Sequence, residues 1–269
     1  KLIDNPTTGP RDYPVDRLRE MKRAHEEKIE KICGLFNVPK TEIVCFSSPI
    51  KGVTAVEIDY DLAARAVLPS KQPGSSYGIN LQVKSAYPYT SKEYWNDCYR
   101  QLKSSFDLYM RNPIIQRGNA AFSVFSVAPI PLIIKLGELI GDKLPCDVYQ
   151  KTRFPDTWEW QAKELTNSFV VDVVKTDVTN GIAALNISLT NDVNNDRILS
   201  AGEFEAIYKI KASATGVDCI KSIEDLSAFW HTYQGVLDEI LNKHGAGCQI
   251  HLFPAMPVSA ALKLVGDIC

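Results

Sequence analysis

The sequence predicts an α/β protein made of two similar halves, each a mainly parallel sheet flanked by helices. Two observations carry this prediction: short apolar runs alternate with helix-like stretches, and one order of elements occurs twice. One copy ends in FSVFSVAPIPLIIKLGELI at Ile140, and the other ends in HLFPAMPVSAALKLVGDI at Ile268. Alternating strands and helices are typical of parallel sheets, and a recurring unit indicates an internal duplication.

Composition narrows the classes of function. The chain has 269 residues, of which 45% are hydrophobic, enough for one large domain or two small ones. Its net charge of -2 provides no global basic field for DNA or anionic lipid. No apolar run approaches the roughly 20 residues of a membrane span, so a soluble protein without a membrane partner is expected. Seven scattered cysteines with no CxxC pair disfavour disulfides and zinc and favour the cytoplasm.

The N-terminal region is expected to form a helix over residues 14–34, followed by a linker at 37–39. Apolar residues recur there at helical spacing with charges between them, and Gly34 is expected as the C-cap. The apolar stripe consists of Val15, Leu18, Met21, Ile29 and Ile32.

The first half is expected to begin with a buried strand at 42–46. The elements that should follow are a loop at 71–78, a strand at 79–83, a helix at 91–108, a strand at 121–127, a helix at 132–140 and a strand at 145–149. The run at 121–127 is apolar almost throughout, as is typical of a strand inside a parallel sheet.

The second half repeats this order. It is expected to contain a strand at 183–189, a long helix at 222–243, a buried strand at 249–253 and a helix from 259 onward. Ser222 is expected to cap the long helix, with Asp225 at its third position. The two copies align when Pro131 is matched with Pro257, which lies 126 positions later.

The two proline corners, where a strand turns into a helix, are the first candidate site. Ligands of open parallel sheets settle beyond the carboxyl ends of the strands, and helix N-termini offer free N–H groups to phosphates. Proline is also common at helix starts for purely structural reasons, so a single corner is weak evidence for a ligand site. Two corners at related positions favour a ligand pocket.

Three stretches are similar to the SAVED family of sensor domains, and the resemblance extends over about residues 40–269. They are APIPLIIKLGELIGDKLPCDVYQKTR at 128–153, DTWEW at 156–160 and HLFPAMPVSAALKL at 251–264. The resemblance implies two fused CARF-like, Rossmann-type halves, at 40–165 and 166–269. It implies binding of a cyclic oligonucleotide, a cyclic di- or trinucleotide, in CBASS-type bacterial antiphage signalling. The family would place another strand after the last helix, whereas this chain stops at Cys269.

The N-terminal stretch KLIDNPTTGPRDYPVDRLREMKRAHEEKI is similar to the segment that follows the last histidine of HNH nucleases. This resemblance implies that residues 1–39 are the tail of an HNH domain, with its helix and a linker. The catalytic residues and the divalent metal would then lie upstream of Lys1, as would the contacts with double-stranded DNA. We therefore expect no catalytic centre and no cofactor in this chain, and His25 is assigned no chemistry.

A cyclic oligonucleotide needs cations or N–H donors for its phosphates and flat surfaces for its bases. Lys51, Lys151 and Arg153 follow expected strands, although a solvated surface charge is the alternative for each. Trp158 and Trp160 should point to opposite faces, so one can stack on a base while the other packs in the core. The candidate ligand-binding residues are Ser47, Lys51, Pro129, Gln150, Lys151, Arg153, Trp158, Trp160, Thr190, Asn191, Phe253, Pro254 and Met256.

A calcium site is a competing interpretation of DVNNDRILSAGE. Asp192, Asn194, Asp196 and Glu203 stand at positions 1, 3, 5 and 12 of an EF-hand loop. The sixth position, which calls for glycine, is Arg197, and the preceding segment alternates like a strand. The resemblance to the SAVED family implies instead that this segment is the first strand-end loop of the second half, equivalent to residues 47–49, with Thr190 and Asn191 near the ligand.

Two classes of function remain open. The first is a sensor that forms a homo-oligomer on activation and switches on the fused HNH endonuclease. The second is a CARF-like ring nuclease that cleaves its own cyclic ligand, for which Lys51 with Ser47 and Ser48 could serve. The sequence contains no HExxH, GxSxG, Walker or GxGxxG motif.

Overall fold

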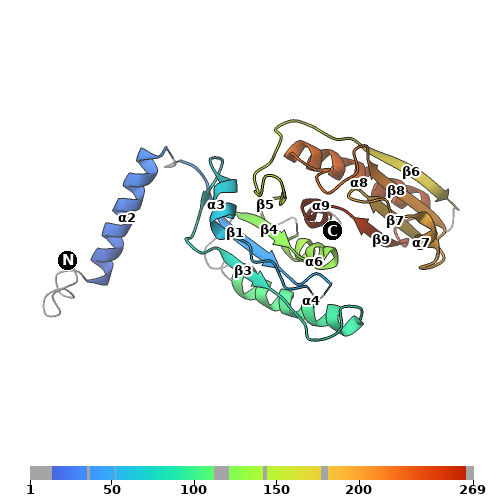
Figure 1. Cartoon of the computed structure of the whole chain (residues 1–269), viewed down its shortest axis with the longest axis horizontal. Helices are drawn as coiled ribbons and strands as arrows, with labels where there is room; N and C mark the ends of the chain where they lie inside the picture. The colour runs from blue at the N-terminus through green and yellow to red at the C-terminus, as the bar shows by residue number, and fades with distance from the viewer. Residues whose placement is uncertain are drawn as a thin grey trace.

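The computed structural model describes residues 14–34, 37–51, 53–111, 121–141, 144–176 and 181–264. It shows two sheets surrounded by helices, with α6 and α9 lying between the sheets (Figure 1). The predicted α/β class, with two related halves, is confirmed by this arrangement. The first part of the HNH-like stretch, residues 1–13, and the tail at 265–269 lie outside the described residues.

The first helix, α2 (Val15–Ile32), stands apart from both sheets (Figure 1). Its C-cap is Cys33 instead of the expected Gly34. Gly34 follows with a φ of 73°, which is the left-handed conformation that glycine adopts freely just past a helix end.

The first sheet is parallel throughout. Its path is β2-β1-β4-β5, with β3 also paired to β1. The strands are β1 (Lys40–Ser47), β2 (Gln72–Pro73), β3 (Ile79–Gln82), β4 (Phe122–Val127) and β5 (Cys146–Val148). The helices are α3 (Tyr60–Val67), α4 (Lys92–Phe106), which continues into the π-helical turn η1 (Asp107–Arg111), and α6 (Ile130–Ile140).

The second sheet has the order β6-β8-β7-β9, in which β6 runs antiparallel to β8 and the other pairs are parallel. Its strands are β6 (Phe169–Thr176), β7 (Ile182–Ser188), β8 (Ala206–Ala212) and β9 (Gln249–Ala255). Its helices are α7 (Asn195–Leu199), α8 (Ile223–His244) and α9 (Val258–Lys263). The sequence of β7, α8, β9 and α9 repeats that of β1, α4, β4 and α6.

The match between the two proline corners needs a correction. Helix α6 begins at Ile130, two residues earlier than expected, and its N-cap is Pro129. Helix α9 begins at Val258 with Pro257 as its N-cap, so Pro129 and Pro257 are the equivalent residues. Pro131 lies inside the first turn of α6, where a missing N–H breaks no helical hydrogen bond.

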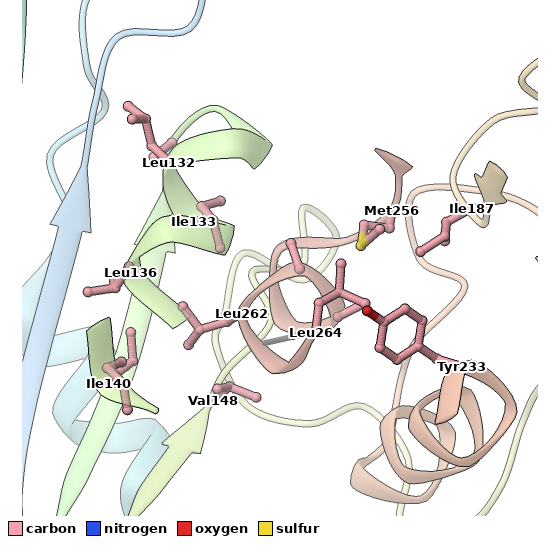
Figure 2. Packing of buried hydrophobic residues seen from close by; sticks show 14 of the residues in the cluster. Leu132, Ile133, Leu136, Ile140, Val148, Ile187, Tyr233, Met256, Leu262 and Leu264 are labelled. Carbon is pink, nitrogen blue, oxygen red and sulfur yellow. The ribbon is translucent and has the colours of Figure 1, made fainter. Parts of the chain in front are cut away.

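The halves are joined by the packing of α6 against α9. A Cβ atom on Gly137 of α6 would lie 2.4 Å from the carbonyl oxygen of Leu262 in α9, so the helix backbones approach unusually closely. Leu132, Ile133 and Leu136 belong to the same buried cluster as Leu262 (Figure 2). Because this cluster also contains residues of both sheets, the two halves share one continuous core.

Candidate functional site

The carboxyl ends of the parallel strands form the candidate site. In the first half, Ser47 at the end of β1 pairs with Val127 at the end of β4. In the second half, Ser188 at the end of β7 pairs with Ala255 at the end of β9. Each edge leads into a proline-capped helix, and neither Pro129 nor Pro257 contributes a side-chain cap. The fold therefore brings two related strand-to-helix corners to one helix pair.

Buried serines lie at the edge of the first half. Ser47 and Ser48 are both buried, and the Ser48 N–H donates to the Val127 carbonyl over 3.1 Å. Ser126, next to the end of β4, is 1% exposed, and its hydroxyl has no hydrogen-bond partner among the described residues. A buried hydroxyl without a partner is costly, so Ser126 is a further candidate that sequence reasoning missed. Its only sequence signal is a polar residue within the apolar run FSVFSV.

Gln150 connects the first half to the second. Its Oε1 accepts hydrogen bonds from the Ser259 N–H at 3.2 Å and from the Ser259 hydroxyl at 3.0 Å. Its Nε2 donates to the Lys151 carbonyl at 3.1 Å. The carboxamide thus satisfies an N–H group in the first turn of α9, which Pro257 cannot cap.

The cationic candidates after β5 lie in different environments. Lys151 forms an ion pair with Asp156, and its Nζ lies 5.4 Å from the centroid of the Trp158 ring. Arg153 is exposed in a turn whose two sides are bridged by Thr152 and Thr157. Arg153 is therefore presented to solvent, whereas Lys151 is partly engaged.

The two tryptophans also differ. Trp158 is only 2% exposed, and its ring meets the edge of Phe125 with centroids 5.2 Å apart. Trp160 is half-buried against the core that both halves share. Of the two rings, Trp158 is the one that packs in the core, and Trp160 retains exposed surface.

Lys51 lies in a tight turn beyond the end of β1. It is exposed, and its φ of 51° places a non-glycine residue in the left-handed region. Ile50 and Val53 form an isolated bridge around it. Backbone strain of this kind often occurs at ligand sites.

In the second half, a polar network holds the loop after β7. The Asn186 Nδ2 donates to the Val193 carbonyl at 2.9 Å, and the Ser188 hydroxyl donates to Asn186 Oδ1 at 2.8 Å. Lys209 Nζ also donates to the Val193 carbonyl, at 3.1 Å, and pairs with Asp192 at 2.6 Å. Sequence reasoning missed Asn186, Ser188 and Lys209, although each interrupts an otherwise apolar strand.

This network holds Thr190 and Asn191 at the edge of the sheet. The Thr190 N–H donates to the Ala255 carbonyl at the end of β9 over 2.9 Å. Thr190 is half-buried, and Asn191 is exposed. Both candidates therefore lie where β7 and β9 end, beside the second corner.

Residues of the second corner itself are mostly packed. Phe253 is half-buried, with its ring centroid 5.6 Å from that of Phe204. Pro254 is half-buried, whereas Met256 is only 4% exposed and lies in the shared core (Figure 2). Contacts from this corner would come mainly from its backbone.

The EF-hand interpretation is wrong. Asn194 caps α7 with its side chain, accepting from the Asp196 N–H at 2.8 Å, so a helix begins inside the supposed loop. Asp192 is paired with Lys209. The part of the chain that the structure describes contains no group of three or more His, Cys, Asp or Glu side chains placed to hold a metal ion.

A cavity of about 520 Å³ lies away from the corners, beside α3 and the first sheet. Two carboxylates, Glu57 and Asp59, line it, together with Cys45, Ile58, Tyr60, Tyr77, Ile79 and Asn80. Carboxylates repel phosphates, so this cavity is unsuited to a nucleotide backbone.

These features define a domain of two related α/β halves whose strand-to-helix corners meet at one helix pair. The chain belongs to the SAVED family: the model for the "SMODS-associated and fused to various effectors sensor domain" matches residues 108–265. None of the described helices is long and apolar enough to cross a membrane.

Two solved structures of an Acinetobacter baumannii protein are similar in fold. Both are of the Cap4 SAVED/CARF-domain containing receptor, one with the cyclic trinucleotide 3'3'3'-cAAA and one with 2'3'3'-cAAA. Each is 12% identical to this chain, with TM-scores of 0.50 and 0.49. They match 93% and 92% of this chain, which spans 50% of the length of each. The search of curated proteins gave no match.

Proposed function

We propose that this chain is the sensor of a CBASS-type bacterial antiphage system. It binds a cyclic di- or trinucleotide and thereby activates an HNH DNA endonuclease domain fused to its N-terminal side. The family supports the sensing role, since its description names a sensor domain fused to effectors. The Cap4 receptor, whose structure contains a cyclic trinucleotide, supports the class of ligand.

The observation that carries the proposal is the pairing of the two corners. Pro129 caps α6, Pro257 caps α9, and the two helices pack against each other. A cyclic oligonucleotide repeats one chemical unit around a ring, so two related half-sites side by side suit its shape. The N-terminus of the longer helix, α6, offers N–H groups to that ring.

Charge and aromatic groups at this edge suit the rest of the ligand. In the proposed complex, the exposed cations Lys51 and Arg153 and the partly engaged Lys151 contact the phosphates. Trp160 offers the partly exposed ring on which a base can stack. Thr190 and Asn191 supply polar groups from the second half.

Native mass spectrometry with a panel of cyclic di- and trinucleotides tests the proposal. We expect one cyclic ligand per chain, and no complex with the linear trinucleotide of the same bases. Failure of every cyclic ligand to bind, or equal binding of the linear form, would contradict the sensing role.

The ring-nuclease alternative is less well supported. Its candidate hydroxyls, Ser47 and Ser48, are both buried, while Lys51 is exposed in its turn. A nuclease that uses the ribose 2'-hydroxyl must align that group in line with the leaving oxygen, and buried serines are poorly placed to help. We expect chromatography to recover the ligand intact after prolonged incubation, whereas linear products would favour the nuclease.

We also propose that activation produces a larger homo-oligomer, most simply a tetramer. Cutting both strands of DNA needs two nuclease sites, and a ligand shifts an equilibrium only by its differential affinity for two states. The divalent metal and the DNA contacts would belong to the nuclease domain. Light scattering of the nuclease-containing protein should show a mass increase at saturating ligand, and an unchanged mass would refute this part.

A further inference from the structure

Phe154 is the most exposed large apolar residue among those that the structure describes, at 94%. It lies in the turn at residues 153–156, all four of which are exposed. Every other phenylalanine in the described part of the chain is buried or half-buried. A fully exposed aromatic ring contributes no burial to the fold, which leaves it available to a binding partner.

The turn lies at the carboxyl edge of the sheets, where the candidate site is found. Before the turn, Gln150 accepts two hydrogen bonds from Ser259 in the first turn of α9. After the turn, the N–H groups of Gln161 and Ala162 donate to the carbonyl of Lys221, just before α8, at 2.9 and 3.1 Å. Helices α8 and α9 follow strands β8 and β9, so both ends of the segment that carries the turn are fastened at this edge.

Hydrogen bonds within the turn hold it in one shape. The N–H and the hydroxyl of Thr152 both donate to the Thr157 carbonyl, at 2.9 and 3.0 Å. The Thr157 hydroxyl accepts from the Glu159 N–H at 3.1 Å, and Lys151 forms an ion pair with Asp156. A group that is already held in its binding conformation loses little entropy when it binds, so this turn presents its aromatic ring at a low entropic cost.

The composition of the turn fits a nucleotide base better than a protein surface. A docking face for a protein needs contiguous apolar area, whereas charged residues, Arg153 and Asp156, flank the ring of Phe154 and its proline neighbour. Helix α2 leads into the first sheet at Lys40, the amino end of β1, and the turn follows the carboxyl end of the parallel strand system. One ring is enough for one base, because stacking uses only the face of that ring.

We propose that Phe154 stacks on a base of the cyclic ligand, an inference that rests on the sensing role proposed above. Arg153, the preceding residue, then meets a phosphate, so that adjacent residues of one turn hold two chemical parts of a nucleotide. Trp160, further along the same segment, keeps exposed surface for a second base. Every base has a flat face, so Phe154 supplies affinity and does not select among the bases.

Calorimetry with cyclic di-AMP, cyclic di-GMP, cyclic GMP–AMP and 3'3'3'-cAAA tests the role of Phe154. For each probe that binds the unmodified chain, Phe154→Ala should weaken binding about five- to hundredfold. Phe154→Leu keeps apolar area without an aromatic face and should lose most of the same affinity, whereas Phe154→Tyr and Phe154→Trp should retain it. Unchanged affinity in Phe154→Ala, or wild-type affinity in Phe154→Leu, would overturn the proposal.

Tyr77→Ala is the matched control. Tyr77 is 90% exposed and precedes β3, at the amino edge of the first sheet, so this variant should bind the same probes with unchanged affinity. Salt gives a second criterion: the loss in Phe154→Ala should stay constant as salt rises, whereas the loss in Arg153→Glu should shrink because salt screens charge. A loss in Phe154→Ala that disappears at high salt would show an electrostatic effect and contradict stacking.

The outcomes separate this inference from the sensing role. Probe binding by the unmodified chain with no loss in Phe154→Ala would refute the stacking contact and leave the sensing role intact. Normal probe binding by Phe154→Ala, combined with loss of the ligand-induced mass increase, would assign the ring to contacts between copies and would also refute stacking. If no probe of the panel binds the unmodified chain, the sensing role and the stacking contact both fail.

Discussion

Gln150 and Ser259, 109 positions apart, are joined by two hydrogen bonds to one amide oxygen. The oxygen belongs to the loop that follows β5, and the donors belong to the first turn of α9. Proline cannot cap a helix with its side chain, so the first half supplies the cap that the second half lacks. The second corner is therefore completed by a residue of the first half, Gln150.

Replacing Gln150 with Leu should destabilise the chain by about 1 kcal/mol, the usual cost of a lost helix cap. Urea denaturation measures this change. Gln150→Glu keeps an acceptor oxygen and should lose much less stability. A double-mutant cycle with Ser259→Ala should show coupling, and strict additivity would mean that the two side chains act independently.

Gly137 should tolerate no side chain. In Gly137→Ala the new Cβ would lie 2.4 Å from the Leu262 carbonyl, so α6 and α9 must separate. We expect a loss of about 1–3 kcal/mol, as for other overpacked cores, together with a lower thermal midpoint. The control is Gly235→Ala in α8, where a Cβ would meet nothing within 4 Å. That variant should be neutral or up to about 1 kcal/mol more stable, because alanine favours helix.

Arg153→Glu should weaken ligand binding while leaving the fold intact. Loss of one charge-assisted phosphate contact costs about 1.5–3 kcal/mol, and the reversed charge adds repulsion. Calorimetry gives the affinity, and Lys163→Glu, which makes the same charge change at an exposed position after Trp160, is the control. Unchanged affinity in Arg153→Glu would remove this residue from the site.

Lys209→Met should loosen the loop after β7. The variant removes the ammonium that holds the Val193 carbonyl and Asp192. We expect faster hydrogen exchange at residues 189–194 and weaker ligand binding. The control is Lys211→Met. Lys211 lies on the same strand, but it pairs with Asp172 of β6 and not with the loop after β7. Equal exchange in both variants would contradict the anchoring role.

Asp225 should make stability sensitive to acid. Burial raises the pKa of this carboxyl, but hydrogen bonds from the Thr166 hydroxyl and from the N–H groups of Lys221, Thr166 and Asn167 outweigh burial and lower it below 3.8. A lowered pKa stabilises the fold fully above the unfolded value of about 3.8, and this stabilisation is lost as pH falls through the folded value. Asp225→Asn should therefore cost about 2 kcal/mol near pH 7.

The deficit of Asp225→Asn relative to the unmodified chain should shrink at pH values below 3.8, where the native carboxyl also becomes protonated. Denaturation midpoints at several pH values report this difference. A deficit that is constant from pH 7 to strong acid would show that the charge of Asp225 does not matter.

The central strands of the parallel sheets were predictable because they are apolar on both faces. FSVFSV and IVCF lie between helices, so their sequences carry no polar alternation, and length separates them from helices. The long helices α4 and α8 were predictable from their serine caps and periodicity. The pairing of the two corners followed from duplication, although the proline match had to be shifted.

Strand β8 and helix α7 were missed for different physical reasons. Strand β8 contains Lys209 and Lys211, and lysines in a sequence indicate an exposed segment. Only the folded chain shows that Lys209 is paired with Asp192. Helix α7 has only five residues, too few for a periodic pattern. For the site, the sequence placed two tryptophans on opposite faces but could not say which faces the core, because Phe125 and Trp158 meet only in the folded sheet.

Among the described residues, strand β9 lies at the end of its sheet, whereas its counterpart β4 is flanked by β1 and β5. The Gln249 N–H and the Ala255 carbonyl face β7, so the alternate residues Ile250, Leu252 and Pro254 direct their main-chain groups to the outer side. Proline has no N–H, so Pro254 removes one donor from that row. Any strand that pairs with this side of β9 would find only two outward N–H donors, those of Ile250 and Leu252, among the residues from Ile250 to Pro254.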